Sequence, residues 1–475
     1  MNKREFLKTS ALGALGVMLA PSLLRSFPGQ RRLRTAHIGV GNMGAEDLKA
    51  ISSHPRVDVV ALCDVDALNL EAAHKLHPNA RVFADYREML KEMESEIDAV
   101  IVSTPDHTHA PASLMAMQMN KSVYCQKPLT HYVSEARDMK RVAAEKGLVT
   151  QMGIQVHSFY DYRLATLLIQ SGIIGKVHTV HAWSPKNHGY DGLPPEGEDP
   201  VPAHLNWDLW VGTSRMRPYK DKFYHPGVWR KLMDYGCGTL GDMGVHIFDT
   251  PYNALKLDVP RTIVNECRPS NGFGFPENNK VTYEFPGTEY TTRKLKWIWY
   301  DGPGAPPMHK DLVLPGMDPK SAGKKASGEV TPGKVSLDPK IAGANELPEQ
   351  GAMFVGKKGR LLLPHFMQLP RKIVNGEYVD ISEEIARVSA EHGLGEPIRN
   401  YDTEGPKHYH QFVDACLGNG ECSAPFEYAS RLTETILLGT IAGRFPGQTL
   451  HWDAKAARFK EEEANQYLSG EYRKF

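Results

Sequence analysis

The sequence of 475 residues predicts an α/β fold in two domains. Residues 31–154 alternate short apolar runs with helix-like segments, the pattern of a doubly wound parallel sheet. A glycine-rich turn directly follows the first apolar run. Residues 155–475 are expected to form an α+β domain with an open, largely antiparallel sheet, because strand-like alternation dominates, for example over residues 281–300.

The glycine-rich turn joins a β-prone run, residues 35–38, to a helix-like segment, residues 45–51. Its G-x-G-x-x-G spacing suits a dinucleotide: the first glycine makes the tight turn, the second lets the backbone approach a pyrophosphate, and the third lets the helix pack on the strand. The phosphates then lie at the helix N-terminus. Three glycines at this spacing also occur in ordinary loops. The turn residues are Gly39, Gly41, Asn42, Met43 and Gly44.

The second apolar run, residues 57–63, ends in Asp64, about 20 residues after the last glycine, where a dinucleotide fold places its ribose-binding acid. A carboxylate here accepts hydrogen bonds from the adenosine ribose and repels a 2′-phosphate, which predicts NAD rather than NADP. Because Asp66 follows closely and turns favour aspartate, Asp64 also fits a plain strand-end turn.

The rest of the first domain repeats strand and helix, with strands predicted at residues 97–103, 122–125 and 148–153 and a helix from residue 110 to 120. Ligands of such sheets bind beyond the carboxyl ends of the strands. The candidate cofactor contacts that fall there, besides Asp64, are Thr104, Pro105, Asp106, His107, His109, Gln126, Lys127 and Gln155.

The first 30 residues predict an export signal outside the fold. Lys3, Arg4 and Lys8 precede an apolar run of small residues, 11–20, which is too short to span a bilayer comfortably. The pattern resembles a twin-arginine signal in which Lys3 replaces the first arginine. Such substrates cross the membrane folded, so we expect a periplasmic protein that holds its cofactor tightly. An amphipathic N-terminal helix is the alternative.

Composition excludes several classes. The 56 basic and 56 acidic residues give a formal net charge of zero, and no long block of one sign marks a nucleic-acid partner. No membrane segment is expected once the signal is removed. The six cysteines are scattered without a CxxC pair, so neither a metal site nor a disulfide framework is predicted, although Cys416 and Cys422 could pair.

The second domain contains a segment rich in Gly, Pro and Lys, residues 302–350. It is too long for a plain connector, which predicts an active-site lid or an arm that grips a neighbouring subunit. Two late helices, residues 407–417 and 429–445, are expected on the sheet face away from the cofactor. His408 and His410 are expected at the surface of the first.

Several motifs in order make the chain after about residue 34 resemble the Gfo/Idh/MocA oxidoreductase family, whose members include proteins similar to glucose-fructose oxidoreductase and glycoside 3-dehydrogenase. Besides the glycine turn and Thr104-Pro105, they are Gln126-Lys127-Pro128, where the family has Glu-Lys-Pro, and residues 236–249 (GCGTLGDMGVHIFD), which match GGGxLxDxGxHxxD. The resemblance implies an NAD-dependent enzyme that acts on small carbohydrates and forms dimers or tetramers. The neutral Gln126 lacks the carboxylate that would tune Lys127.

Oxidation of a carbinol requires a base beside the nicotinamide ring, and Lys127 and His246 are the candidates. Shielding from water lowers the pKa of a lysine, whereas histidine titrates near neutrality. Asp242 and His246 lie four residues apart, hence on one helical face, and Asp249 follows on the same stripe. The resemblance makes Lys127, Asp242 and His246 the catalytic residues. The alternatives are polar residues paired inside a helix, or a metal site of Asp242, His246 and Asp249.

Carbohydrate sites combine an aromatic face with fixed donors, although aromatic side chains also suit a core. His188 and Tyr235 are further residues of the right type. The predicted substrate contacts are Lys127, His157, Trp229, Arg230, Asp242 and His246.

The leading hypothesis is an oxidoreductase that acts on a ring hydroxyl, at C3, of a sugar or glycoside and transfers hydride to tightly bound NAD. One alternative is an NAD-dependent glycosidase or lyase that works by transient oxidation and elimination, with Tyr235 or Tyr190 as a second base. The other is a regulatory protein that holds NAD without turnover, which an intact set of Lys127, Asp242 and His246 argues against.

Overall fold

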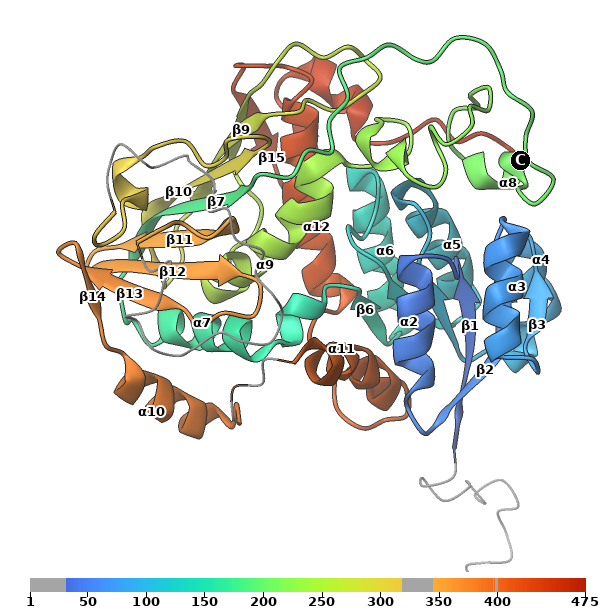
Figure 1. Ribbon diagram of the computed structural model, residues 1–475, viewed down its shortest axis with the longest axis horizontal. Helices are drawn as coiled ribbons and strands as arrows, with labels where there is room; N and C mark the ends of the chain where they lie inside the picture. Colours follow the sequence, from blue (N-terminus) through green and yellow to red (C-terminus); the bar gives the residue numbers. More distant parts are fainter. Residues whose placement is uncertain (1–30, 318–344, 396, 398–399) are drawn as a thin grey trace, which may run out of the picture.

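The computed structural model describes residues 31–317, 345–395, 397 and 400–475 and shows two domains side by side (Figure 1). The predicted export signal and residues 318–344 of the predicted insert lie outside the described residues. None of the described helices has the length and apolar character needed to cross a membrane.

The first domain is the predicted doubly wound sheet. Its six strands run parallel in the order β3-β2-β1-β4-β5-β6. The strand order reverses between β1 and β4, and this switch point is where ligands bind in such sheets. The elements are β1 (Leu33–Ile38), α2 (Met43–Ser52), β2 (Val57–Cys63), α3 (Ala67–Leu76), β3 (Arg81–Phe83), α4 (Tyr86–Glu92), η1 (Glu94–Glu96), β4 (Ala99–Val102), α5 (Asp106–Gln118), β5 (Ser122–Cys125), α6 (Val133–Lys146) and β6 (Thr150–Met152).

The second domain is built on a ten-stranded sheet of order β14-β13-β12-β11-β7-β10-β9-β8-β15-β16. Only β7 and β10 pair in parallel among these neighbours, which confirms the largely antiparallel sheet. The strands are β7 (Val177–Ser184), β8 (Thr262–Glu266), β9 (Asn279–Pro286), β10 (Thr291–Asp301), β11 (Gln350–Gly356), β12 (Gly359–His365), β13 (Arg371–Val374), β14 (Glu377–Val379), β15 (Leu450–Asp453) and β16 (Arg458–Phe459).

Helices cover one face of this sheet and connect it to the first domain. Trp297 and Trp299 of β10 share a face, as their spacing predicts, and pack against Phe248 of α9 with ring centroids 4.3 and 5.7 Å away. The segment with η5 (Lys310–Leu312) packs on the opposite face. The other helices of the second domain are η2 (Gln155–Ser158), α7 (Tyr160–Gln170), α8 (Trp207–Val211), η3 (Val228–Lys231), η4 (Leu240–Gly244), α9 (Val245–Ala254), α10 (Ser382–His392), α11 (Tyr401–Cys416), α12 (Phe426–Ala442) and η6 (Glu462–Tyr467).

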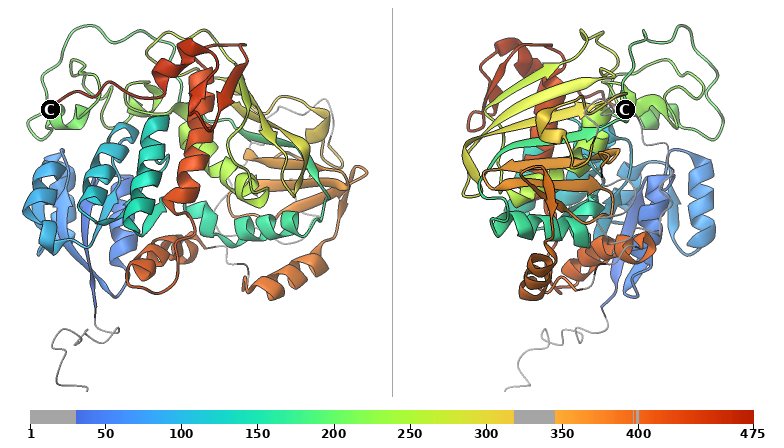
Figure 2. Two further views of the ribbon diagram at one scale, coloured as in Figure 1. Left: turned by 180° about the vertical axis from the view of Figure 1, so that it is seen from behind. Right: turned by 60° about the vertical axis from the view of Figure 1, so that its left-hand side comes forward.

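The expected position of the late helices is wrong. α11 packs on α2 of the first domain, and α12 lies between α6 and the second sheet (Figure 2). Tyr409 and Phe412 of α11 enter a core with Tyr124 of β5. His408 is fully buried rather than exposed, because its ring binds the Met152 carbonyl at 2.9 Å. These helices therefore join the two domains.

Candidate active site

The glycine turn has the geometry of a dinucleotide-binding loop. Gly39 has a φ of +81°, and a Cβ there would lie 2.6 Å from the Ser103 carbonyl oxygen. A Cβ on Gly44 would lie 2.2 Å from the Gly39 carbonyl oxygen, so only glycine lets α2 approach this closely. Asn42 precedes α2 but gives no side-chain cap. The start of α2 therefore leaves room for a phosphate, which fits the pyrophosphate of NAD.

Asp64 fixes this turn from the end of β2. Its carboxylate accepts hydrogen bonds from the N–H groups of Val40 and Asp66, each at 2.9 Å. Burial raises the pKa of Asp64, and the two backbone donors oppose that rise. His204 and His225 of the second domain contact the Asp66 carboxylate at 2.9 and 3.1 Å. The second domain thus covers the sheet edge where the adenosine ribose is predicted.

The segment after β4 differs from the expectation, because α5 begins at Asp106 rather than at residue 110. His107 faces the backbone carbonyls of Tyr235 and Trp210 at 3.3 and 2.9 Å. His109 faces two carbonyls of the first domain at 2.8 and 2.9 Å. Burial lowers the pKa of both histidines. Each ring nitrogen of His107 and His109 already faces a backbone carbonyl oxygen. The geometry therefore argues against the cofactor contacts predicted for these two side chains.

Three further residues at the end of β4 lie nearer to the crevice. A Cβ on Gly39 would lie 3.1 Å from the backbone nitrogen of Thr104, so Thr104 and Pro105 adjoin the glycine turn. Asp106 is buried, and one of its carboxylate oxygens has no hydrogen-bond partner among the described residues. Arg230 approaches the other oxygen at 3.9 Å.

Gln126, which replaces the family's glutamate, is buried and bonded within the protein. Its amide donates to both carboxylate oxygens of Asp47 on α2, at 2.9 and 3.0 Å. Ser103 and Tyr409 donate to the same carboxylate at 2.6 and 2.7 Å, and burial raises the pKa of Asp47 to about 6. Gln155 donates to the Tyr409 hydroxyl at 2.8 Å. Gln126 and Gln155 therefore belong to one buried network.

Lys127 and Asp242 meet across the two domains. The Nζ atom of Lys127 lies 2.8 Å from the Asp242 carboxylate and 3.1 Å from its carbonyl oxygen. His188 contacts the second carboxylate oxygen at 2.9 Å, and Arg230 approaches the first at 3.3 Å. The Lys127 and Asp242 side chains are only 13% and 11% exposed. Three nitrogen groups from separate segments thus converge on one carboxylate.

This convergence sets the charge of the pair. Burial by itself favours neutral Asp242, but Lys127, His188 and Arg230 outweigh it and hold the pKa of Asp242 well below its ordinary value. Burial lowers the pKa of Lys127, and Asp242 opposes that fall. Asp242 is therefore ionised and anchors the lysine.

His246 follows Asp242 by four residues, and the helical backbone between the two residues is irregular. Leu240–Gly244 form a π-helical turn and α9 begins at Val245; such turns are frequent at functional sites. The Nδ1 atom of His246 is buried and has no partner in the described part of the chain. Burial and then the Lys127 ammonium lower the pKa of His246 well below its ordinary value. A neutral imidazole thus lies within electrostatic reach of Lys127.

Asp249 does not continue the stripe of Asp242 and His246. Its carboxylate contacts Nδ1 of His157 at 2.9 Å and accepts a hydrogen bond from Tyr428 at 2.6 Å. The π-helical turn changes the helical spacing on which the stripe was predicted. Because Asp242 and Asp249 face different partners, the metal site considered for these residues has no geometric support.

The aromatic candidates separate into two environments. The Arg230 guanidinium lies 4.4 Å from the centre of the Trp229 ring, which keeps Trp229 beside the Asp242 cluster. Tyr235 is fully buried and donates to the Arg215 carbonyl at 3.1 Å. Burial raises the pKa of Tyr235, and this position rules it out as a second base.

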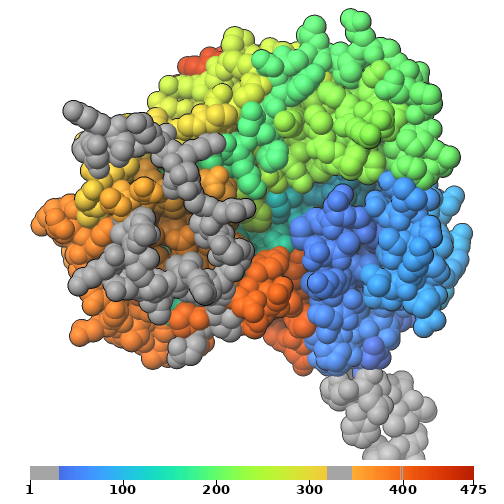
Figure 3. All heavy atoms as spheres, viewed as in Figure 1, coloured from blue at the N-terminus to red at the C-terminus, as the bar shows by residue number. Residues whose placement is uncertain are grey.

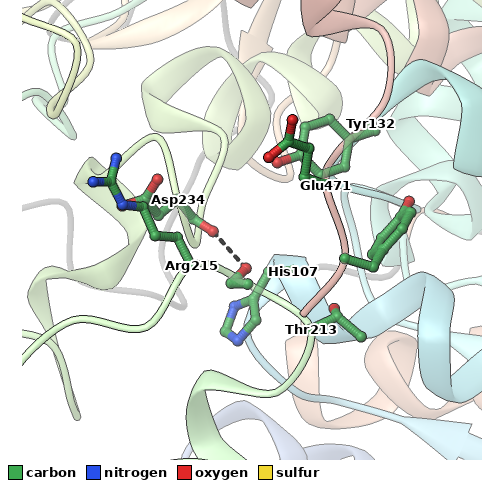
Figure 4. A pocket seen from close by; sticks show the side chains of 8 residues that line it. His107, Tyr132, Thr213, Arg215, Asp234 and Glu471 are labelled. Carbon is green, nitrogen blue, oxygen red and sulfur yellow. Dashed lines mark hydrogen bonds between the residues drawn. The ribbon is translucent and has the colours of Figure 1, made fainter. Parts of the chain in front are cut away.

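The crevice is open at the surface. Figure 3 shows a hollow between the blue first domain and the green and orange segments of the second. A separate cavity of about 150 Å³ is drawn in Figure 4. Its lining differs from the catalytic cluster and consists of His107, Tyr132, Thr213, Ser214, Arg215, Asp234, Glu471 and Tyr472.

Sequence reasoning missed His365 and Asp47. The His365 ring lies 6.1 Å from the His246 ring, and its Nδ1 atom meets the Tyr162 hydroxyl at 2.5 Å. His365 is the last residue of β12, and the pairing of β12 with β11 in the sheet places it near His246. No sequence motif includes Asp47. The only signal that could have identified it is an acidic residue on α2 that could pair with the neutral Gln126.

The fold and the cluster at Lys127 define a two-domain protein with an NAD-binding Rossmann domain and a mixed-sheet domain that completes its site. Two family models match the chain: "Oxidoreductase family, NAD-binding Rossmann fold" over residues 33–154, and "Oxidoreductase family, C-terminal alpha/beta domain" over residues 165–266. Residues 33–154 and 165–266 thus match the two domains of the Gfo/Idh/MocA oxidoreductase family.

Curated relatives match over part of the chain. An inositol 2-dehydrogenase of Mycolicibacterium smegmatis is 33% identical over 31% of this chain and 44% of its own length. A glycosyl hydrolase family 109 protein of Stenotrophomonas maltophilia is 28% identical over 42% of this chain and 45% of its own length. The chain thus matches less than half the length of these relatives.

The solved structures share the fold over most of the chain. The WlbA dehydrogenase of Chromobacterium violaceum, solved with NADH and UDP-GlcNAcA, superposes with a TM-score of 0.57 at 15% identity, covering 89% of this chain and 97% of that one. At this identity the likeness establishes the common fold.

Proposed function

We propose that this protein is an NAD-dependent oxidoreductase that acts on a ring hydroxyl, at C3, of a sugar or glycoside. The observation that carries the proposal is the Lys127–Asp242 ion pair of 2.8 Å beside neutral His246, just beyond the carboxyl end of β5. The relative named inositol 2-dehydrogenase and the neighbour solved with UDP-GlcNAcA support a ring hydroxyl as the target.

Bound NAD supplies the hydride acceptor or donor. The glycine turn, Asp64 and Thr104 would hold it along the strand ends. Neutral His246 accepts the hydroxyl proton on a ring nitrogen, because burial keeps the ring unprotonated before the reaction. The Lys127 ammonium donates a hydrogen bond to the carbinol oxygen and stabilises the charge that develops there. Asp242 keeps Lys127 protonated and in place.

Variants of the two proton-handling residues test this assignment. Lys127→Ala and His246→Ala should each lower turnover by at least about 100-fold, the usual contribution of such a group. A screen of sugars with mass detection of the hydrogen pair lost identifies the substrate. Retained NAD shows that each variant is folded, and the exposed His178→Ala is the matched control. Full activity in both variants would disprove the proposed site.

We also propose that residues 1–30 direct export of the folded chain to the periplasm and that NAD stays tightly bound during export. We further propose that the mature protein is a dimer or tetramer. An exported enzyme has no free NAD pool from which to reload. Protein purified from the periplasm should therefore carry close to one NAD per chain without addition, measured by absorbance after denaturation. Protein found only in the cytoplasm would contradict the export proposal, and cofactor-free protein would contradict tight retention.

A second candidate function is favoured by the relative named glycosyl hydrolase family 109 protein. In this scheme a transient ketone acidifies the neighbouring C–H, the aglycone is eliminated, and hydride returns. Incubation with an aryl glycoside separates the two candidates: a stable keto-glycoside indicates net oxidation, whereas released phenol with free sugar indicates elimination and hydrolysis.

A further inference from the structure

Side chains able to bind a metal ion lie together on one face of the second sheet. This face is opposite to the one that α9, which carries His246, covers. Residues 302–317 cover this face, where Leu312 and Leu314 pack on an apolar layer that includes Trp183. The layer also contains a fully buried histidine, His181 of β7.

His181 meets His309 and Asp311 of the covering segment. The Nε2 atom of His181 lies 3.2 Å from Oδ2 of Asp311, and Nδ1 of His309 lies 3.6 Å from the same oxygen. The two imidazole centroids are 4.6 Å apart. One ligand atom of each residue lies within 4.8 Å of the other two, the only such group of three among the described residues.

The two separations from the Asp311 oxygen are close to those between ligands of a shared cation, and the 3.2 Å contact with His181 also lies within hydrogen-bonding distance. Zinc binds histidine nitrogen and carboxylate oxygen at about 2.0–2.2 Å, so ligand atoms in a tetrahedral site lie roughly 3.3–3.5 Å apart. The 3.6 Å between Nδ1 of His309 and the Asp311 carboxylate is too long for a hydrogen bond. This nitrogen accepts instead from the Asp311 backbone N–H at 3.2 Å, a bond that a cation at Nδ1 would replace. The other ring nitrogen of His181, Nδ1, lies 3.4 Å from the Tyr300 hydroxyl, which is the usual support for the free nitrogen of a ligating histidine.

We propose that His181, His309 and Asp311 bind one divalent cation of borderline softness, Zn²⁺ being the best match, with water completing the coordination. Two imidazoles and one carboxylate are the donor set that such cations prefer. The cation fastens residues 302–317 to β7. It takes no part in the redox step, because the site lies on the opposite face of the sheet from α9.

The test uses the full-length protein, stripped with a chelator and titrated with Zn²⁺. One tight equivalent should bind, Zn²⁺ should raise the Tm, and Co²⁺ should give the visible absorption of a site with nitrogen and oxygen ligands. His309→Ala and Asp311→Asn should each lower Zn²⁺ affinity by more than about 100-fold, since loss of mere supporting partners already costs 10–100-fold.

Two controls keep the result decisive. Because His309 and Asp311 are partly exposed, both variants should fold. Asp311→Asn should keep the metal-free Tm, whereas His309→Ala should lower it slightly, because the His309 ring caps η5 through the Asp311 N–H. His178→Ala removes an exposed histidine of the same strand and should leave Zn²⁺ binding unchanged. The proposal is overturned if the wild type binds no Zn²⁺ at micromolar concentration, or if the two ligand variants bind it as the wild type does.

Discussion

At the scale of single residues, the structure gives a physical reason for the amide at position 126. The Gln126 amide nitrogen lies 2.9 Å from the carboxylate of Asp47, which is completely buried. A glutamate there would place two carboxylates in one buried space, whereas glutamine supplies a donor. Gln126 and Asp47 therefore depend on each other, and their pairing connects α2 to the residue that directly follows β5.

The first prediction concerns Gln126→Glu. Above pH 6 the variant should lose roughly 2 kcal/mol or more, because its new carboxyl must be ionised beside Asp47 or protonated at a cost. The pKa of Asp47 is already raised from 3.8 to about 6. An acid whose pKa is raised by folding stabilises the fold below its unfolded pKa, and that contribution is lost as the pH rises through the folded value.

The Tm difference between wild type and Gln126→Glu should therefore be small near pH 4 and grow up to and beyond pH 6. Thermal melts in a series of buffers measure it. Gln118→Glu adds the same charge at an exposed position of α5 and should show no such trend. A pH-independent difference would show that the two carboxyls do not interact.

At the scale of elements, the glycine turn and α2 are one unit. Gly44→Ala would bring a Cβ to 2.2 Å from the Gly39 carbonyl oxygen, so the start of α2 must move away from the strand. We expect a lower Tm and at least a tenfold loss of NAD affinity, since the phosphate site is formed by these backbone groups.

Gly227→Ala is the matched control for that variant. A Cβ at position 227 meets nothing within 4 Å, and the residue has a negative φ of −122°. It should leave both the Tm and NAD binding unchanged. NAD titration by fluorescence and thermal melts supply both measurements; unaltered NAD affinity in Gly44→Ala would show that α2 can retreat without cost.

Helices and strands were predictable where residues close together in the sequence determine them. Five strands of the first sheet were predicted because parallel strands buried on both faces are continuous apolar runs. The sixth, β3, was not predicted, because it is a short edge strand that is largely exposed. The early start of α5 was not predicted; its first turn includes His107, whose ring faces the carbonyls of Tyr235 and Trp210, distant in the sequence. The π-helical turn at Leu240–Gly244 was not predicted either, and it changed the partner expected for Asp249.

At the scale of the whole molecule, an ion pair between α6 and α12 connects the domains, and its two side chains differ in burial. Arg137 of α6 contacts Glu434 of α12 at 2.7 Å, and the Glu434 side chain is completely buried. Arg431 and Trp452 also donate to Glu434, at 2.8 and 3.0 Å. Arg137→Ala should cost about 1–3 kcal/mol, because a buried carboxylate loses one of its donors.

A second pair between the same helices serves as the control. Lys140 and Glu427 lie 2.6 Å apart, but Glu427 is exposed and Lys140 is partly exposed, so Lys140→Ala should cost less than about 1 kcal/mol. Chemical unfolding monitored by fluorescence compares the two variants. Equal losses would show that burial of Glu434 does not decide the strength of the contact.

The sequence by itself determined the two-domain order, the glycine turn, NAD as the cofactor and the segments that carry Lys127, Asp242 and His246. These follow from apolar periodicity and short motifs, which act between neighbours in the chain. The tertiary structure alone decided that His188 and Arg230 hold Asp242, that Asp47 pairs with Gln126, and that the late helices join the domains. His188 with Asp242 and Gln126 with Asp47 are pairs more than fifty positions apart, and no local pattern records which distant side chain will complete a buried hydrogen bond.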